Sequence, residues 1–302
     1  MLWNKAIGAK GGATYTRGVF GGGTSGAVSS VMDYITIPTT GNAINFGSLT
    51  VARDNLDGVS NGTRGVFGGG FSTTESNVMD YITIATTGNA TTFGNLTVAR
   101  FGLAGVSSTT RGVFGGGANP NRSVMDYITI ATTGNATNFG NLTSATLGLA
   151  GVSSSTRGVF GGGYTISMTA AMDYITIATT GNATSFGSLT VARVNPAGVS
   201  SSTRGVFGGG NTSFAAIDRS SVMDYITIAT TGNATTFGSL TVARNVPAGV
   251  SSGDRGVFGG GFTTVNVAVM DYIEIATTGN ATNFGNLTVA RSGAGGVGVS
   301  GS

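Results

Sequence analysis

The sequence contains neither cysteine nor histidine, and only 9% of its 302 residues are charged. The absence of cysteine excludes disulfides and thiolate metal sites. The absence of histidine removes the commonest metal ligand and the usual general base of catalysis. No segment reaches the roughly 18 apolar residues of a membrane helix, and MLWNKAIGAKGG at the start has no apolar stretch of signal-peptide length. We therefore expect a protein that is not an enzyme, binds no cofactor or metal, and does not insert into a membrane.

Basic runs are also absent. The net charge is only +3, and the arginines are spread one or two per repeat instead of forming a patch. A protein that binds nucleic acid concentrates its positive charge on one face or along one segment. We therefore expect no nucleic-acid partner.

What the chain does contain is a sixfold repeat. RGVFGGG begins at Arg17, Arg64, Arg111, Arg157, Arg204 and Arg255, at intervals of 46 to 51 residues. Repeats of this length are typical of solenoids, arrays and propellers. We interpret residues 13–302 as one repeat domain and residues 1–12 as an extension outside it.

Each repeat predicts four short strands. In the fourth copy they cover residues 158–160, 172–177, 183–189 and 197–201, separated by Gly, Asn and Ser. The segment MDYITI at 172–177 is apolar on both faces, which is typical of a strand covered on both sides. Blades around an axis and rungs of a solenoid both provide such cover, and four antiparallel strands per repeat favour blades.

The order of these features resembles the Kelch repeat. There, an apolar strand ending in Gly-Gly is followed by a variable loop, a tyrosine-containing strand, an aromatic residue and an arginine. The fourth copy has GVFGGG, MDY, Phe186 and Arg193 in that order, and only the third copy departs at the arginine, with Thr146. The near-identity of the copies is also similar to glycine-rich repeat propellers of bacteriophage structural proteins.

This resemblance implies an all-β, six-bladed propeller with a non-enzymatic role in a virion. Such a protein is a tail fibre, a receptor-binding component or a surface decoration protein. A bacterial cell-surface or scaffold adhesin that recognises carbohydrate or protein is the alternative.

The end of the chain predicts how the ring closes. Val297 lies six residues after Arg291, as Val199 lies six after Arg193, yet no RGVFGGG follows it. We expect residues 296–300 to pair with the strand that begins at Arg17. The first and last strands then share one blade, which removes the open edges that invite aggregation.

Charges recur at fixed places in each copy and need partners if they are buried. We predict a structural ion-pair network between the RGV arginines or the second arginines and the repeat aspartates; an anion-binding ring in the channel is the alternative for the arginines. The second arginines are Arg53, Arg100, Arg193, Arg244 and Arg291. The predicted network comprises Arg17, Asp33, Arg64, Asp80, Arg111, Asp126, Arg157, Asp173, Arg204, Asp224, Arg255 and Asp271.

The copies differ mainly between GGG and MDY, and just after the second arginine. In a four-stranded antiparallel blade these two connections lie at the same end, so we expect one variable, ligand-binding face. Host glycan or protein is the expected partner, because exposed aromatics beside polar groups suit such recognition; drift in unconstrained loops is the alternative. The candidate contacts are Phe71, Asn119, Asn121, Arg122, Tyr164, Phe214, Asp218, Arg219 and Phe262.

The extension at residues 1–12 holds the only tryptophan and both lysines of the chain. We expect Trp3 and Lys5 to dock the propeller onto other virion proteins, with a frayed tail as the alternative.

Overall fold

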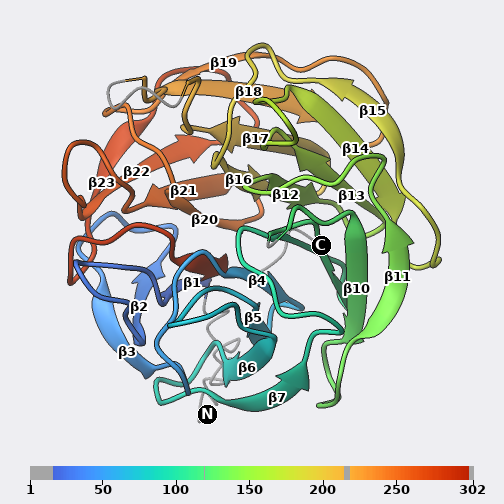
Figure 1. The fold of residues 1–302 in the computed structure, drawn as a ribbon. Coiled ribbons are helices and arrows are strands. Elements are labelled where there is room, and N and C mark those ends of the chain that lie inside the picture. The colour runs from blue at the N-terminus through green and yellow to red at the C-terminus, as the bar shows by residue number, and fades with distance from the viewer. Residues whose placement is uncertain (1–15, 119, 214–217, 299–302) are drawn as a thin grey trace, which may run out of the picture.

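The computed structural model describes residues 16–118, 120–213 and 218–298. Its strands form six sheets of four antiparallel strands, arranged as blades around a central axis (Figure 1). The predicted six-bladed β-propeller is therefore confirmed. Among the described residues, no helix is long and apolar enough to cross a membrane.

In every blade the strands follow one another from the axis outward. Blade 1 consists of β24 (Gly295–Val297), β1 (Arg17–Gly21), β2 (Val31–Thr36) and β3 (Ile44–Ser48). Blade 2 consists of β4 (Asp57–Ser60), β5 (Arg64–Gly68), β6 (Val78–Thr83) and β7 (Thr91–Asn95). Blade 3 consists of β8 (Ala104–Ser107), β9 (Arg111–Gly115), β10 (Val124–Thr129) and β11 (Thr137–Asn141). Blade 4 consists of β12 (Ala150–Ser153), β13 (Arg157–Gly161), β14 (Ala171–Thr176) and β15 (Thr184–Ser188). Blade 5 consists of β16 (Ala197–Ser200), β17 (Arg204–Gly208), β18 (Val222–Thr227) and β19 (Thr235–Ser239). Blade 6 consists of β20 (Ala248–Ser252), β21 (Arg255–Gly259), β22 (Val269–Glu274) and β23 (Thr282–Asn286).

The RGVFG strand owes its glycines to close packing between blades. A Cβ on Gly65 would lie 2.6 Å from the side chain of Val297 in blade 1. A Cβ on Gly68 would lie 2.8 Å from the ring of Phe114 in blade 3. Side chains larger than hydrogen at these positions would push the blades apart on both sides.

The hydrophobic core is divided into six clusters, one between each pair of neighbouring blades. On β6, Met79 packs with Phe114 and other side chains of blade 3, whereas Ile82 packs with the cluster shared with blade 1. Both residues are at most 3% exposed. The apolar character of both faces of the MDYITI strand is thus explained by a neighbour on each side.

The first and last strands share one blade and close the ring, as the sequence predicts, although the strand that pairs is Gly295–Val297 and residues 299 and 300 of the predicted segment 296–300 lie outside the described residues. β24 pairs with β1 in antiparallel register, with Val297 opposite Val19 and Gly295 opposite Gly21. The joint between blades 6 and 1 is held at its outer edge by the amide of Asn286, which donates to Oδ1 of Asn42 at 3.0 Å. The same asparagine bond occurs at the other five blade joints. The seam is therefore built like every other joint.

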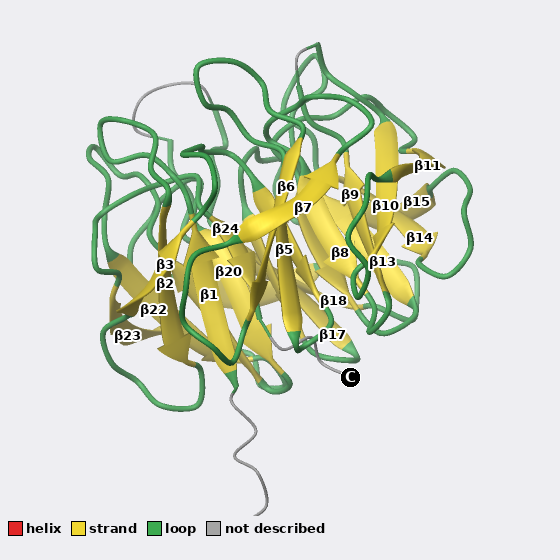
Figure 2. Ribbon diagram, turned by 90° about the horizontal axis from the view of Figure 1, so that it is seen from below, coloured by secondary structure: helices red, strands yellow, loops and turns green. Residues whose placement is uncertain are grey.

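The two ends of the propeller carry different sets of loops (Figure 2). One end carries the GGG loops and the loops that lead from one blade to the next, and we call this end the variable face. These two kinds of loop pair with each other, as in the bridge between Asp54 and Phe71. β1 begins and β24 ends at the opposite end, which we call the constant face because its TTGN and SSST turns vary little.

Candidate functional site: the blade joints and the variable face

Each repeat aspartate lies at the joint with the preceding blade. Five of them form ion pairs of 2.8–3.0 Å with the second arginine of that preceding blade, and both side chains are fully buried. The arginine also donates to a strand carbonyl, as Nη2 of Arg100 does to O of Phe114 at 3.1 Å. The pairs are Arg53–Asp80, Arg100–Asp126, Arg193–Asp224, Arg244–Asp271 and Arg291–Asp33.

Burial lowers the pKa of these arginines below its ordinary value, and the adjacent carboxylate opposes that shift, as Asp126 does for Arg100. The carboxylate is further held by the preceding blade, because Oγ1 of Thr97 donates to Oδ1 of Asp126 at 2.6 Å. Removing one member of such a pair leaves an uncompensated buried charge. Each ion pair therefore holds two neighbouring blades together, and we call the five ion pairs the clamps.

Of the two sets of arginines that the sequence offers as partners, only the second arginines pair with the repeat aspartates, and the RGV arginines do not. The guanidinium carbon of Arg64 lies 4.4 Å from the ring centroid of Tyr81, and Nη1 donates to O of Ala131 in the next blade at 2.8 Å. The other five RGV arginines also lie over tyrosine rings, at 4.3–4.5 Å. Arg255 additionally pairs with Glu274. The RGV arginines thus stack on a tyrosine of their own blade and bond to carbonyls of the next blade, instead of pairing with the repeat aspartate.

The joint between blades 3 and 4 is different. Thr146 stands where the other joints have arginine, and among the described residues no ion pair involves Asp173. This carboxylate is half-buried and accepts hydrogen bonds from the amide and the hydroxyl of Thr143, at 2.9 and 2.8 Å. A cavity of about 130 Å³ occupies the place of the missing side chain, lined by Thr146, Phe160 and Asp173 among others.

The predicted contact residues of the variable face connect neighbouring loops. Nδ2 of Asn121 donates to O of Tyr164 at 3.2 Å. The guanidinium of Arg219 lies 4.9 Å from the ring centroid of Phe262. These side chains are half-buried, so the variable loops form a connected layer. The remaining described candidates, Phe71, Arg122 and Asp218, are half-buried in the same layer.

Two predicted contacts, Asn119 and Phe214, lie outside the described residues, as do the predicted docking residues Trp3 and Lys5.

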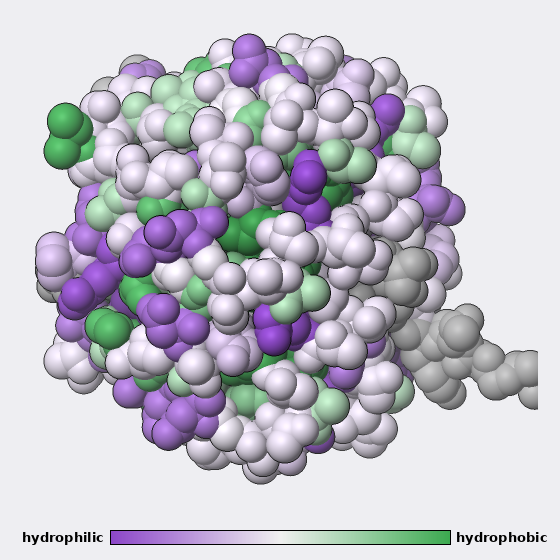
Figure 3. Space-filling model, turned by 90° about the vertical axis from the view of Figure 1, so that its right-hand side faces the viewer, coloured by the Kyte–Doolittle hydropathy of each residue, from purple (hydrophilic) through white to green (hydrophobic). Residues whose placement is uncertain are grey.

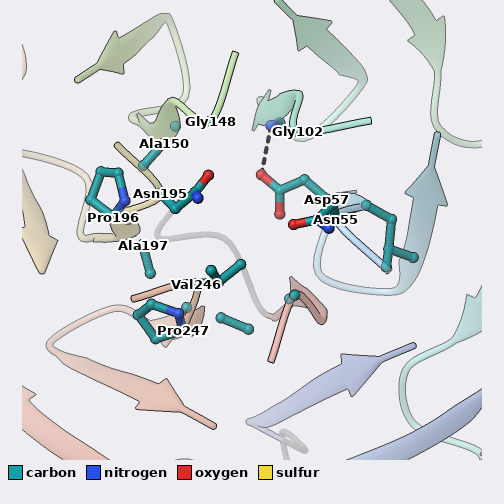
Figure 4. Close-up of a pocket in the computed structure, with 18 of the residues that line it drawn as sticks. Asn55, Asp57, Gly102, Gly148, Ala150, Asn195, Pro196, Ala197, Val246 and Pro247 are labelled. Carbon is teal, nitrogen blue, oxygen red and sulfur yellow. Dashed lines mark hydrogen bonds between the residues drawn. The ribbon is translucent and has the colours of Figure 1, made fainter. Parts of the chain in front are cut away.

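Sequence reasoning missed a ring at the channel mouth on the variable face (Figure 4). Each blade contributes to this ring one residue with a positive φ, which donates its amide to the carbonyl of the equivalent residue of the preceding blade, at 2.7–3.1 Å. The six bonds form a closed circle. Its members are Asn55, Gly102, Gly148, Asn195, Val246 and Gly293. Gly and Asn tolerate positive φ well, which is the sequence signal for this ring.

Asp57 lies just inside this ring, at a position where the other blades have alanine or glycine. Its carboxylate accepts the amides of Gly58 and Gly105, both at 2.8 Å. Burial raises the pKa of Asp57 to about 6, although backbone amides oppose the shift. The cavity at this mouth has a volume of about 110 Å³ and is lined mainly by small residues. It offers one titratable group and no partner for acid–base chemistry within the described lining.

Among the described residues, no cluster of three or more acidic, histidine or cysteine side chains could hold a metal ion. No known family model matches the chain, and no curated protein is similar to it in sequence. The fold and the joints define a six-bladed β-propeller with buried inter-blade ion pairs.

Proposed function

We propose that this protein is a non-enzymatic structural and binding module of a virion, related to Kelch-like phage propellers. In this role it is a tail fibre, a receptor-binding component or a surface decoration protein. The resemblance of the repeats supports the virion setting. The scarcity of groups capable of catalysis supports a binding role.

The observation that carries the proposal is the separation of variable and constant parts. The loops that differ between copies gather on one face, while the strands and joints repeat nearly unchanged. β1, the first described strand, begins on the opposite face. A module attached through its N-terminal extension would therefore point its variable face outward.

The surface suits recognition of a polar partner. Figure 3 views the ring from its rim and shows strongly hydrophilic and weakly polar residues with scattered apolar ones and no broad apolar area. Seven large apolar side chains are exposed among the described residues, the most exposed being Ile166 at 93%. Broad apolar patches mark sites that bury large apolar partners. A carbohydrate or a polar protein surface fits the variable face better.

Co-sedimentation tests the setting. Native material is fractionated on a density gradient, and the protein is followed by mass spectrometry. Co-migration with intact particles after a high-salt wash supports the proposal. Recovery in soluble or cell-envelope fractions alone refutes it and favours the cellular adhesin.

A loop exchange tests the role of the variable face. Residues 211–221 of the fifth copy are replaced by the shorter loop of the fourth copy, residues 164–170. We expect normal incorporation into particles but weaker attachment to host cells. The matched control changes a turn on the constant face, replacing residues 61–63 (NGT) with the equivalent residues 108–110 (STT) of the next copy, and should leave attachment unchanged.

A further inference from the structure

The joint between blades 3 and 4 has a cavity where the other five joints have an arginine side chain. Each of those joints contains a guanidinium group between an aspartate and the carbonyl of the phenylalanine in RGVF. Its distances are 2.8–3.0 Å to the carboxylate and 3.1–3.3 Å to that carbonyl. The equivalent residues at the sixth joint are Asp173 and Phe160, and both line the cavity.

The acceptors of the site are retained although the donor is missing. Thr146 is too short to reach the carboxylate, and its hydroxyl donates instead to O of Ser144 at 3.1 Å. The backbone around the site follows the common pattern, because β13 and β14 keep the same register as the other blades. The cavity of about 130 Å³ is far above the roughly 15 Å³ needed for one water molecule. The joint therefore keeps both acceptor residues, Asp173 and Phe160, but has no arginine of its own between them.

We propose that this joint binds a guanidinium group from another molecule. A planar guanidinium can hold a carboxylate and a carbonyl together, whereas an ammonium group is a point charge that lacks the fork geometry. The ligand enters beside the variable loop of blade 4, since Thr165 and Thr169 of that loop line the cavity. The source is an arginine side chain of a partner polypeptide or a free guanidino compound. Such a site goes beyond the proposed function, because it would serve a virion protein and a cellular protein equally.

The amide of Thr143 provides a direct reporter, because it donates to Asp173 at 2.9 Å. A ¹⁵N-labelled sample is titrated with N-ethylguanidinium chloride, and with ethylammonium chloride at the same ionic strength. We expect saturable shifts of this amide with a dissociation constant on the order of millimolar, because so small a ligand has few atoms with which to bind. Ethylammonium should bind at least about tenfold more weakly. The corresponding amides at Thr97 and Thr241 should not move, since their aspartates are already paired.

Two variants place the ligand at this joint. Thr146→Arg supplies the guanidinium from within the chain and should abolish binding, and the resonances of the other blades show whether this variant keeps its fold. Thr146→Ser keeps the cavity and should bind as the wild-type chain does. Equal affinity in Thr146→Arg and the wild type, equal binding of ethylammonium, or the absence of saturation would each overturn the proposal.

The source is distinguished with a blocked arginine, N-acetyl-arginine methylamide. Binding at least as tight as that of N-ethylguanidinium supports a partner polypeptide. If the blocked arginine fails where N-ethylguanidinium binds, the cavity admits only free guanidino compounds. Neither result depends on particle association, so failure of this titration is distinct from failure of the virion proposal.

Discussion

Asparagine substitutions at two equivalent aspartates test whether the buried ion pairs hold the blades together. Asp224 and Asp173 occupy the same place in their repeats and both accept a bond from a threonine of the preceding blade. Only Asp224 also pairs with an arginine, Arg193, at 2.8 Å. The comparison of Asp224→Asn with Asp173→Asn therefore isolates the arginine from the rest of the joint.

The structure sets the expected magnitudes. Asp224→Asn leaves the fully buried guanidinium of Arg193 without a counter-charge, which costs about 3–5 kcal/mol. Asp173→Asn leaves no buried charge behind, and the amide oxygen still accepts from Thr143. Its cost is about 1 kcal/mol or less. The two variants should thus differ by at least about 2 kcal/mol in the free energy of unfolding.

Urea unfolding followed by tyrosine fluorescence and circular dichroism measures this difference. Urea is preferred to guanidinium chloride because the guanidinium ion is the ligand proposed for the joint at Asp173. Arg193→Lys is the matched control, since it keeps the positive charge but loses the fork. Equal destabilisation by the two asparagine variants would refute the reasoning, because the value of the aspartate would then come from its threonine contacts.

Three further substitutions address other features. Val246 has φ of 51° in the ring at the channel mouth, where a β-branched residue is strained. Val246→Asn should therefore raise the free energy of unfolding by about 1 kcal/mol in the same assay. A loss of stability would contradict this. The folded-state pKa of Asp57, about 6, exceeds its ordinary value, so its stability contribution is complete below about pH 4 and is lost as the pH rises through 6. Asp57→Asn should therefore gain on the wild type by up to about 3 kcal/mol between pH 4 and 7 in urea midpoints followed against pH, and parallel pH profiles would exclude the shift. Arg64→Ala loses both the ring contact with Tyr81 and the bond to Ala131, and should cost about 1–3 kcal/mol. In a double-mutant cycle with Tyr81→Leu, the part of this cost that comes from the ring contact, about 0.5–1 kcal/mol, should disappear, and additive effects would refute the coupling.

The repeat made the fold predictable but left the ion pairing open. Six copies with four strand-like segments each, and a last segment without a partner, determine a closed ring. The pairing of the aspartates depends on strand register. Arg64 lies opposite Thr83, and Phe67 lies opposite Asp80, so the RGV arginine and the aspartate face opposite sides of the blade. A shift of one residue would have reversed this, and the sequence does not reveal the register.

The ring at the channel mouth could not be predicted from the sequence, for a different reason. Its six members meet only when all blades surround one axis, and successive members are 46 to 51 residues apart along the chain and identical in no more than three copies. At Val246 the residue type gives no sign of a positive φ, whereas glycine and asparagine indicate it at the other five positions. Such a feature arises from closure of the ring and not from any single repeat.

The near-identity of the copies follows from how the joints are made. Every clamp, stacked arginine and asparagine bond connects one repeat to the next, so each copy must fit two neighbours at once. A substitution in one copy therefore disturbs the contacts with both neighbouring blades, unless the altered side chain contacts only one of them. Thr146 meets that condition, because the arginine it replaces acts forward onto blade 4 alone. The chain can thus open one joint to solvent while the other five clamps keep the ring closed, and this makes that joint the place where the scaffold can accept a ligand without losing its shape.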